Sequence, residues 1–267
     1  MNAGHGKLAL ITGASRKAGI GAAIARELAR DGANIFITYY RPYDEETGLA
    51  ESPDDLQSLL AELRQIGARA DGLELDLSDP HAPRNLFNHV EANYGPVTIL
   101  VNNAAYSVRD GIENLSAEQL DKHYAVNIRA MALLCAEFVR RHRENASGGM
   151  SGRIINLTSG QGLNPMPGEL AYAATKGAVE AFTQSLSAEV ARLGITVNAI
   201  DPGATDTGWI SPELKTKWEA RSPMGRLGLP EDAARLTRFL ASEEAGWITG
   251  QVIHSRGGFS WGILEIS

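Results

Sequence analysis

The stretch Thr12-Gly-Ala-Ser-Arg-Lys-Ala-Gly-Ile-Gly21 places three glycines between a short apolar run, Lys7–Thr12, and a stretch with helical periodicity, Ala22–Ala33. The apolar run predicts a buried strand, and the periodic stretch predicts a helix. Glycines in such a turn let the backbone approach a pyrophosphate, and the N-terminus of the helix adds aligned N–H donors and positive potential. A glycine-rich turn without a ligand is the alternative, but the position within a βαβ unit favours a dinucleotide-binding site.

The rest of the chain repeats this alternation of strands and helices. Further strands are expected at Asn34–Tyr40, Arg69–Leu75, Thr98–Val101, Arg153–Leu157, Ile195–Ile200 and Thr249–His254. Further helices are expected at Leu56–Ile66, Pro83–Tyr94, Ala117–Asn145 (with one break allowed), Glu169–Leu193 and Pro230–Ser242. The polar, acid-rich stretch Arg41–Asp55 is expected to be a long loop. Seven strands that alternate with helices, without a linker, predict a single α/β domain over residues 1–267 with a doubly wound parallel sheet.

The composition argues against several classes of protein. The 267 residues carry a net charge of −7 and contain no Lys/Arg block, which disfavours a nucleic-acid partner. The densest basic cluster, Arg140, Arg141 and Arg143, is interpreted as a solvated helix face. The single cysteine, Cys135, lies in an apolar helical stretch and is interpreted as core packing. Because Met1–Lys7 has no apolar signal region and no long apolar run follows, we expect a soluble, cytoplasmic protein.

A second informative stretch, Asn156–Lys176, carries three groups suited to acid–base chemistry: Ser159, Tyr172 and Lys176. Tyr172 and Lys176 are four positions apart, so on a helix they share one face. A free phenol has a pKa of about 10, and lowering it to about 7 requires roughly 4 kcal/mol of preferential phenolate stabilisation. A cation one turn away in a water-poor cleft supplies much of this energy. By itself the pair also fits an ordinary amphipathic helix.

The end of the second expected strand bears on cofactor choice. An NAD site usually has an acidic residue here, bonded to the ribose 2′-hydroxyl. This chain reads Thr38-Tyr-Tyr-Arg41, with a guanidinium and no carboxylate. Arg41 is therefore the expected donor to a 2′-phosphate, with Arg16 as a second one, and NADP is favoured over NAD. The alternative is that Arg41 is merely a charge on a loop.

The order of these motifs resembles the short-chain dehydrogenase/reductase family over nearly the whole chain. The residues that carry the resemblance are the glycine motif, Asp76, Asn102–Ala105, Asn127, Ser159, Tyr172 with Lys176, Pro202–Thr207 and Ile248–Gln251. Ser159 precedes Tyr172 by thirteen positions, which is the family spacing. Within the family, Pro223–Asp232 and Ile248–Gly258 are most similar to 3-oxoacyl-acyl-carrier-protein reductases.

The resemblance implies a Rossmann-type fold of about seven strands and reversible hydride transfer between NADP(H) and a carbonyl or alcohol carbon. Tyr172 would be the general acid, Lys176 would lower its pKa and hold the nicotinamide ribose, and Ser159 would polarise the carbonyl. Asn127 would anchor a water that relays protons toward Lys176. No metal is expected. The implied cofactor-binding residues are Gly13, Ser15, Arg16, Gly19, Ile20, Gly21, Arg41, Asp76, Leu77, Asn103, Ala104, Ala105, Tyr172, Lys176, Pro202, Gly203, Thr205 and Thr207.

Three departures from the family pattern concern the cofactor end. Five residues separate Gly13 from Gly19 where the family has three, so the loop around the pyrophosphate is longer. Ala105 replaces a glycine, which is a small change. The stretch Arg41–Asp55 carries acids that would oppose a 2′-phosphate unless they fold away from it.

The substrate is less well indicated than the cofactor. A 3-oxoacyl-thioester reductase is one interpretation, with a small-molecule ketone or sugar dehydrogenase as the alternative. A non-catalytic NADP-binding regulator is a distant third, because all four catalytic positions are filled. An acyl carrier protein would require a basic surface near the cleft, for which the cluster at 140–143 is the candidate. The substrate loop is placed at about 204–230, and the candidate pocket residues are Tyr106, Gln161, Leu163, Met166, Glu169, Trp209 and Trp218.

Assembly is expected through the helix at 169–193 and the C-terminal region. The last residues carry five apolar side chains, and each would release roughly 1.5–3 kcal/mol when fully buried. Family members usually pair through these two regions, so a homodimer or, preferably, a homotetramer is expected. The five residues are Phe259, Trp261, Ile263, Leu264 and Ile266.

Overall fold

The computed structural model describes residues 6–49, 54–145 and 151–259. At its centre is a parallel sheet of seven strands in the order β3-β2-β1-β4-β5-β6-β7. The strands are β1 (Leu8–Ile11), β2 (Asn34–Tyr39), β3 (Ala70–Glu74), β4 (Ile99–Asn102), β5 (Gly152–Leu157), β6 (Ile195–Asp201) and β7 (Val252–His254). The predicted doubly wound parallel sheet is confirmed. The strand order reverses between β1 and β4, and ligands bind at such a switch point in open α/β sheets.

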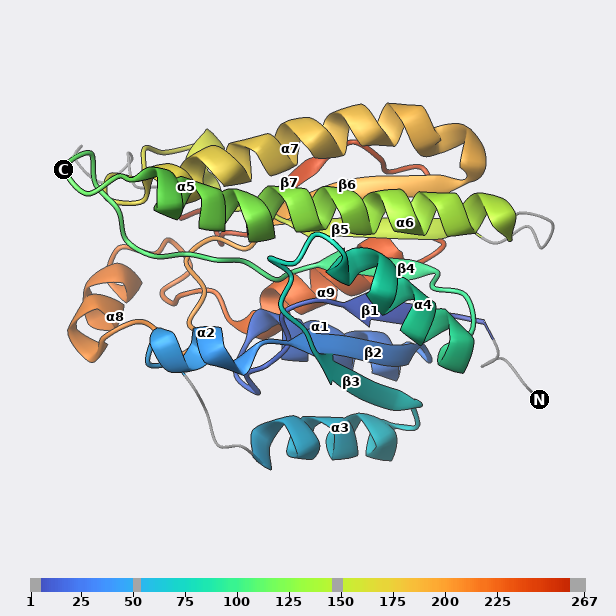
Figure 1. The fold of residues 1–267 in the computed structure, drawn as a ribbon. Coiled ribbons are helices and arrows are strands. Elements are labelled where there is room, and N and C mark those ends of the chain that lie inside the picture. The colour runs from blue at the N-terminus through green and yellow to red at the C-terminus, as the bar shows by residue number, and fades with distance from the viewer. Residues whose placement is uncertain (1–5, 50–53, 146–150, 260–267) are drawn as a thin grey trace.

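Helices cover both faces of the sheet (Figure 1). They are α1 (Ile20–Arg30), α2 (Arg41–Glu46), α3 (Asp54–Ile66), α4 (Ala82–Tyr94), α5 (Ala117–Tyr124), α6 (Met131–Glu144), α7 (Leu170–Val190), α8 (Pro212–Glu219) and α9 (Pro230–Ala241). Helices α1, α3 and α9 bury apolar residues on one face, and α4, α6 and α7 do so on the other. Every strand and helix expected from the sequence is present within three residues of its expected ends.

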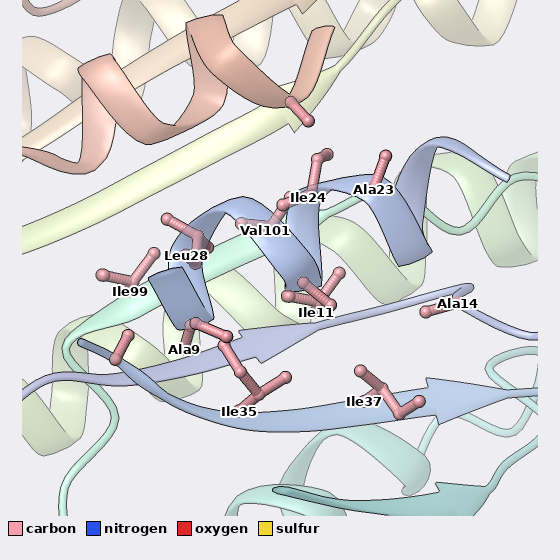
Figure 2. Packing of buried hydrophobic residues seen from close by; sticks show 14 of the residues in the cluster. Ala9, Ile11, Ala14, Ala23, Ile24, Leu28, Ile35, Ile37, Ile99 and Val101 are labelled. Atoms are coloured by element: carbon pink, nitrogen blue, oxygen red, sulfur yellow. The ribbon is translucent and has the colours of Figure 1, made fainter. Parts of the chain in front are cut away.

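The first strand shows how the sequence builds both layers. Successive side chains of a strand point to opposite faces, so Ala9 and Ile11 pack with Ile24 of α1, as Figure 2 shows. Leu8 and Leu10 pack on the other face, among residues of α4 and α6. All four strand residues are buried, which explains why the strand reads as a continuous apolar run. The carboxyl end of β1 is thereby fixed where the glycine loop begins.

The prediction of a loop from Arg41 to Asp55 is wrong in part, because residues 41–46 form the helix α2. Its proline, Pro42, lies in the first turn, where a missing N–H costs nothing. Arg41 and Glu45 pair across one turn at 3.5 Å, and the Thr47 hydroxyl donates to the carbonyl of Tyr43 at 2.9 Å. Prolines and acids suggested a loop, whereas here they serve a helix start and a helical ion pair.

Two further features refine the expected organisation. The helix expected over 117–145 is interrupted by a π-helical turn, Ala125–Ala130, which lies between α5 and α6. The expected substrate loop contains the helix α8, capped by the hydroxyl of Ser211, which accepts from the N–H of Leu214. The loop is closed at its base because the N–H groups of Asp206 and Gly228 bond across it, to the carbonyls of Gly228 and Ala204.

Part of the C-terminal prediction lies outside the described residues. Of the five apolar residues in that stretch only Phe259 is described, and it is buried. Among the helices of the described residues, none combines the length and apolarity needed to cross a membrane.

Candidate functional site

A cavity of about 1,000 Å³ runs along the carboxyl ends of the central strands. It crosses the switch point between β1 and β4, where the fold predicts a ligand. Sixteen of the eighteen expected cofactor residues line it: Gly13, Ser15, Arg16, Gly19, Ile20, Gly21, Asp76, Leu77, Asn103, Ala104, Ala105, Tyr172, Pro202, Gly203, Thr205 and Thr207. Arg41 and Lys176 are not part of its wall. The fold therefore brings residues from the whole length of the chain to one elongated site.

The glycine loop is pressed against the end of β4. A Cβ on Gly13, whose φ is +70°, would lie 2.6 Å from the α-carbon of Ala104, and one on Gly21 would lie 2.7 Å from Nδ2 of Asn103. The Asn103 amide donates to the carbonyls of Thr12 and Gly13 at 2.9 and 2.8 Å. These glycines are thus required by close packing within the protein as well as by any ligand.

The N-terminus of α1 suits a phosphate. No side chain caps this helix at Gly19, and its first turn holds no acidic residue. The first N–H groups of a helix lack intrahelical partners. Here they lie at the cavity wall, together with the positive end of the helix dipole. The two additional residues of the loop form a turn, closed by the Gly19 N–H on the carbonyl of Arg16. Lys17 anchors this turn by donating to the hydroxyl of Ser58 at 2.8 Å.

The end of the cavity beside β2 and α2, where the sequence predicts the adenosine of a cofactor, carries paired charges. Arg16 lies 3.6 Å from Asp44 of α2 and donates to the carbonyl of Thr207 at 2.9 Å, so it bridges three segments. Arg41 instead pairs with Glu45 on the outer side of α2, and its backbone N–H donates to Glu74. Asp44 remains on the cavity wall, together with Glu46, so the acids of this segment do not all fold away.

At the other end, Ser159, Tyr172 and Lys176 meet, as the sequence predicts. The Ser159 hydroxyl lies close enough to the Tyr172 phenol to lower its pKa, and it also contacts Sδ of Met166 at 4.0 Å. The Lys176 ammonium lies 5.5 Å from the centre of the Tyr172 ring and donates to the carbonyl of Leu157 at 2.7 Å. Ser159 follows β5 and the other two lie in α7, so the strand end and the first turns of the helix fix the group.

Burial is the largest cause of the pKa shifts of Tyr172 and Lys176. It raises the pKa of Tyr172 above its ordinary value, and only the hydrogen bond from Ser159 opposes it strongly. It also lowers the pKa of Lys176 to about 8. Lys176 is not among the main causes of the shift in the pKa of Tyr172, although its ammonium lies 5.5 Å from the centre of the ring. Tyr172 is therefore protonated near neutral pH, as a proton donor must be.

Asn127 lies in the π-helical turn and is almost fully buried. Its side-chain oxygen accepts from the N–H of Tyr106 at 2.7 Å, and its amide donates to the carbonyl of the same residue at 2.9 Å. The amide also donates to the hydroxyl of Thr175, which precedes Lys176, at 3.0 Å. The side chain therefore joins the segment after β4 to α7, the helix that carries Tyr172 and Lys176.

The substrate end combines apolar and polar walls. Tyr106, Met166, Trp209 and Trp218 line the cavity as expected, and the two indoles pack edge to face at 5.8 Å. Glu169 also lines it, and burial raises the pKa of its carboxyl group. Two expected pocket residues are not in the wall: Leu163 is exposed, and Gln161 donates to Glu180.

Several cavity residues were not predicted from the sequence, among them Tyr43, Asn164 and Arg256. Tyr43 of α2 donates to the carbonyl of Ser107 at 3.0 Å and packs against Tyr106. Arg256 follows the last strand, and a position just after a parallel strand is the one signal that would have indicated it.

Other expectations concern residues away from the cavity. Arg140 pairs with Glu137 and Glu144, and Arg141 pairs with Glu91, so this surface is largely neutralised. Cys135 is buried, which raises the pKa of its thiol to about 12 and agrees with core packing. Within the described part of the chain, no group of three or more His, Cys, Asp or Glu residues is arranged to hold a metal ion.

Known proteins resemble the chain over nearly its full length. A family model described as enoyl-(acyl carrier protein) reductase matches residues 13–260. An uncharacterized oxidoreductase, YjdA, of Bacillus subtilis (strain 168) is 51% identical, and the match covers 95% of this chain and 96% of that protein. An NADPH-dependent aldehyde reductase-like protein, chloroplastic, of Arabidopsis thaliana is 36% identical, with 95% and 94% covered.

The names of two further matches refer to the reduction of a ketone. The 3-oxoacyl-[acyl-carrier-protein] reductase FabG of Escherichia coli (strain K12) is 35% identical over 95% of this chain and 97% of its own. Among solved structures, the promiscuous reductase LugOII, described as catalysing keto-reduction at C1 during lugdunomycin biosynthesis, superposes with a TM-score of 0.81. It is 35% identical and covers 96% of this chain and 98% of its own.

Proposed function

The chain belongs to the short-chain dehydrogenase/reductase family of oxidoreductases, and we propose that it uses NADP(H) to reduce a ketone to a secondary alcohol. One observation carries the proposal: Ser159, Tyr172 and buried Lys176 come together beside a dinucleotide-sized cavity, whose wall includes Ser159 and Tyr172. Proteins of this family use a nicotinamide cofactor. The choice of NADP(H) and of the substrate is our own inference.

The residues present fit a dinucleotide. The uncapped N-terminus of α1 offers N–H donors to a pyrophosphate, and Asp76 and Leu77 lie at the adenosine end of the cavity. At the other end, Lys176 would hold the nicotinamide ribose, and Thr205 and Thr207 would meet the carboxamide and the phosphates. When bound, the reduced nicotinamide supplies a hydride to the carbonyl carbon.

The chain's own side chains would supply the proton and the positioning. Tyr172 donates its proton to the carbonyl oxygen, so that C=O becomes CH–OH and the phenol becomes a phenolate. Ser159 donates a second hydrogen bond to the same oxygen, where negative charge develops. Lys176, protonated below about pH 8, stabilises the phenolate that forms. Asn127 would position the backbone around a water that returns a proton toward Lys176.

The preference for NADP(H) rests on the adenosine end. The wall at the end of β2 is formed by Thr38, Tyr39 and Tyr40, none of which offers a carboxylate to a ribose hydroxyl. Arg16 lies in the wall and would donate to a 2′-phosphate, with Arg41 farther out. The name of the Arabidopsis relative, NADPH-dependent, points the same way. Asp44 and Glu46 reduce this preference because they add negative charge to the same wall.

For the substrate we retain a 3-oxoacyl thioester as the first candidate, supported by the similarity to FabG. A small-molecule ketone or sugar is the second candidate, and the paired arginines of α6 favour it because they leave little free positive charge for an acidic carrier protein. A non-catalytic regulator is disfavoured by the assembled catalytic group.

The assembly and the location remain proposals. We propose a homotetramer formed through α7 and the C-terminal region, which light scattering at micromolar concentration would test. A monomer mass would contradict it. We also retain a cytoplasmic location, which fractionation of the host cell would check.

The deciding experiment is a screen of cofactor oxidation at 340 nm. NADPH is offered with acetoacetyl thioesters, diketones, quinones and sugars, beside an NADH control and a Tyr172→Phe control. Turnover of a ketone that disappears in Tyr172→Phe supports the proposed function. Cofactor binding without turnover of any compound would support the regulator instead.

A further inference from the structure

Arg256 lies in the cavity wall, between the loop that follows Ser159 and the loop that holds Gly203. A Cβ on Gly160, the neighbour of Ser159, would lie 2.7 Å from Nη2 of Arg256. A Cβ on Gly203 would lie 2.9 Å from Cγ of the same side chain. Consecutive α-carbons are about 3.8 Å apart, so the guanidinium lies beside the backbone that carries Ser159. Two glycines make the room that it occupies.

The guanidinium of Arg256 is buried, and a buried carboxylate offsets its charge. Its side chain is only 8% exposed, and the cavity wall includes it. Asp201, which is fully buried at the end of β6, lies 3.4 Å from Nε. The same carboxylate accepts from the N–H of Gly203 and is hydrogen-bonded to His254 at 2.9 Å. Asp201 is also near enough to raise the pKa of Tyr172, which places the pair within electrostatic reach of the proposed acid.

The guanidinium retains donors that the described part of the protein does not use. Nε is buried without a hydrogen-bond partner among the described residues, because its contact with Asp201 has the distance of an ion pair but not the geometry of a hydrogen bond. Nη1 donates to the side-chain oxygen of Asn164 at 3.2 Å when that amide is oriented to satisfy both of its polar atoms. Nε is closed off against Asp201, whereas Nη2, which lies beside Gly160, has no hydrogen bond to the described residues. An acceptor from a ligand would therefore be favoured at Nη2.

We propose that Arg256 is a specificity-determining residue that donates a hydrogen bond to a second carbonyl oxygen of the substrate, beside the ketone held by Ser159 and Tyr172. The substrate class is therefore a dicarbonyl compound. A neutral acceptor fits better than an anion, because Asp201 already offsets the charge of Arg256 and the charge of Arg109 acts on Glu169 in the same wall. This inference rests on the proposed ketone reduction and deepens it.

The test uses a matched pair of ketones. Ethyl 3-oxobutanoate carries an ester carbonyl, and 4-ethoxybutan-2-one lacks only that second carbonyl oxygen. Their ratio of kcat/KM is measured with NADPH for the unchanged protein, Arg256→Lys and Asp201→Asn/Arg256→Met. The double variant removes both charges together and so leaves no buried unpaired carboxylate. Melting temperatures confirm that each variant is folded.

We expect the ester-to-ether ratio to fall at least tenfold in the double variant and by less in Arg256→Lys, which keeps a charge but loses the forked donor. A loss of the same factor for both ketones would show that Arg256 only supports the loops, and would overturn the proposal. Acetoacetate, which carries a carboxylate in place of the ester, is measured as the anionic substrate. A higher kcat/KM for acetoacetate than for the ester would show that the second group is a carboxylate and would overturn the neutral dicarbonyl class.

A binding measurement separates this proposal from the proposed function. Calorimetry measures the binding of both ketones to the NADPH complex of Tyr172→Phe. The measurement is repeated after Asp201→Asn/Arg256→Met is added to this variant. Tighter binding of the ester that requires Arg256 supports the subsite even when no turnover is found in the unchanged protein, in which case the proposed function alone fails. Equal binding of the two ketones in all variants would overturn the subsite while leaving ketone reduction intact.

Discussion

The two ends of the cavity are held in different ways. At the catalytic end, Lys176 and Asn127 are buried, and each polar group bonds to the backbone or to a neighbour at 2.7–3.0 Å. At the adenosine end, Arg41 pairs with Glu45 at the surface at 3.5 Å, and the partly exposed Arg16 lies 3.6 Å from the buried Asp44. Buried hydrogen bonds are costly to break, whereas exposed ion pairs contribute about 0–1 kcal/mol. Changes at the first end should therefore have larger effects than changes at the second.

The largest effect is expected for Tyr172→Phe. Loss of a general acid typically lowers kcat by about a hundredfold or more, while the phenyl ring preserves the packing of α7. Affinity for NADPH should stay nearly unchanged, because the pyrophosphate and adenosine contacts lie elsewhere. Fluorescence titration and steady-state kinetics measure the two quantities. Retention of more than half of the activity would remove Tyr172 from the mechanism.

Asn127→Ala should come next. The change leaves the N–H and the carbonyl of Tyr106 without their partner, and each unpaired buried group costs about 1–3 kcal/mol. We expect the free energy of unfolding to fall by about 2–3 kcal/mol, measured by urea denaturation. Asn127→Asp keeps the acceptor for the N–H of Tyr106 and loses the donor to its carbonyl. Equal stability of Asn127→Ala and the unchanged protein would show that this bridge contributes nothing.

The same contrast explains what the sequence could predict. The proximity of Ser159, Tyr172 and Lys176 was predictable because Tyr172 and Lys176 lie on one helix, and Ser159 follows the strand that precedes it. The strands were predictable because parallel strands buried on both faces read as apolar runs. Both signals are local in the chain.

Features that depend on distant contacts were missed. Asp44 is buried because Arg16 approaches it from another loop, and nothing within residues 41–55 indicates this. The sequence also does not show that Arg256 lies beside Gly160, since that requires the pairing of β6 with β7. The helix α8 was also missed, but a local signal for it exists. Ser211 followed by Pro212 and Glu213 is typical of a helix start.

The pH dependence of stability should report the burial of Lys176. Its pKa is about 8 in the folded protein against 10.5 for an exposed lysine, so between these values the unfolded chain binds more protons. Stability then rises with pH. From pH 7 to 9.5 we expect this lysine to add about 2 kcal/mol to the free energy of unfolding.

Urea denaturation at the two pH values, for the unchanged protein and Lys176→Met, isolates this contribution because the other groups cancel in the difference. Lys217→Met is the matched control, since Lys217 is exposed on α8. It should show the pH dependence of the unchanged protein. A slope that survives in Lys176→Met would place the titrating group elsewhere.

The smallest effect is expected at the adenosine end, in cofactor choice. A charge-assisted hydrogen bond contributes about 1.5–3 kcal/mol, and Asp44 and Glu46 on the same wall subtract from it. We therefore expect NADPH to be preferred over NADH by at least tenfold in kcat/KM, or about 1.4 kcal/mol. Arg16→Ala should remove most of this preference, because Arg16 lies in the cavity wall. Arg41→Ala should remove less than Arg16→Ala, because Arg41 pairs with Glu45 outside the wall.

Two further measurements sharpen this last prediction. Asp44→Asn removes the acid that competes for Arg16 and should increase the preference for NADPH. Raising the salt concentration from 0.1 to 1 M shortens the Debye length from about 10 to about 3 Å and should reduce the preference. The effect of Tyr172→Phe on kcat should not change with salt in this way, since Lys176 and Asn127 beside it are buried. Equal use of NADH by the unchanged protein, or a ratio that Arg16→Ala leaves untouched, would show that neither arginine meets a 2′-phosphate.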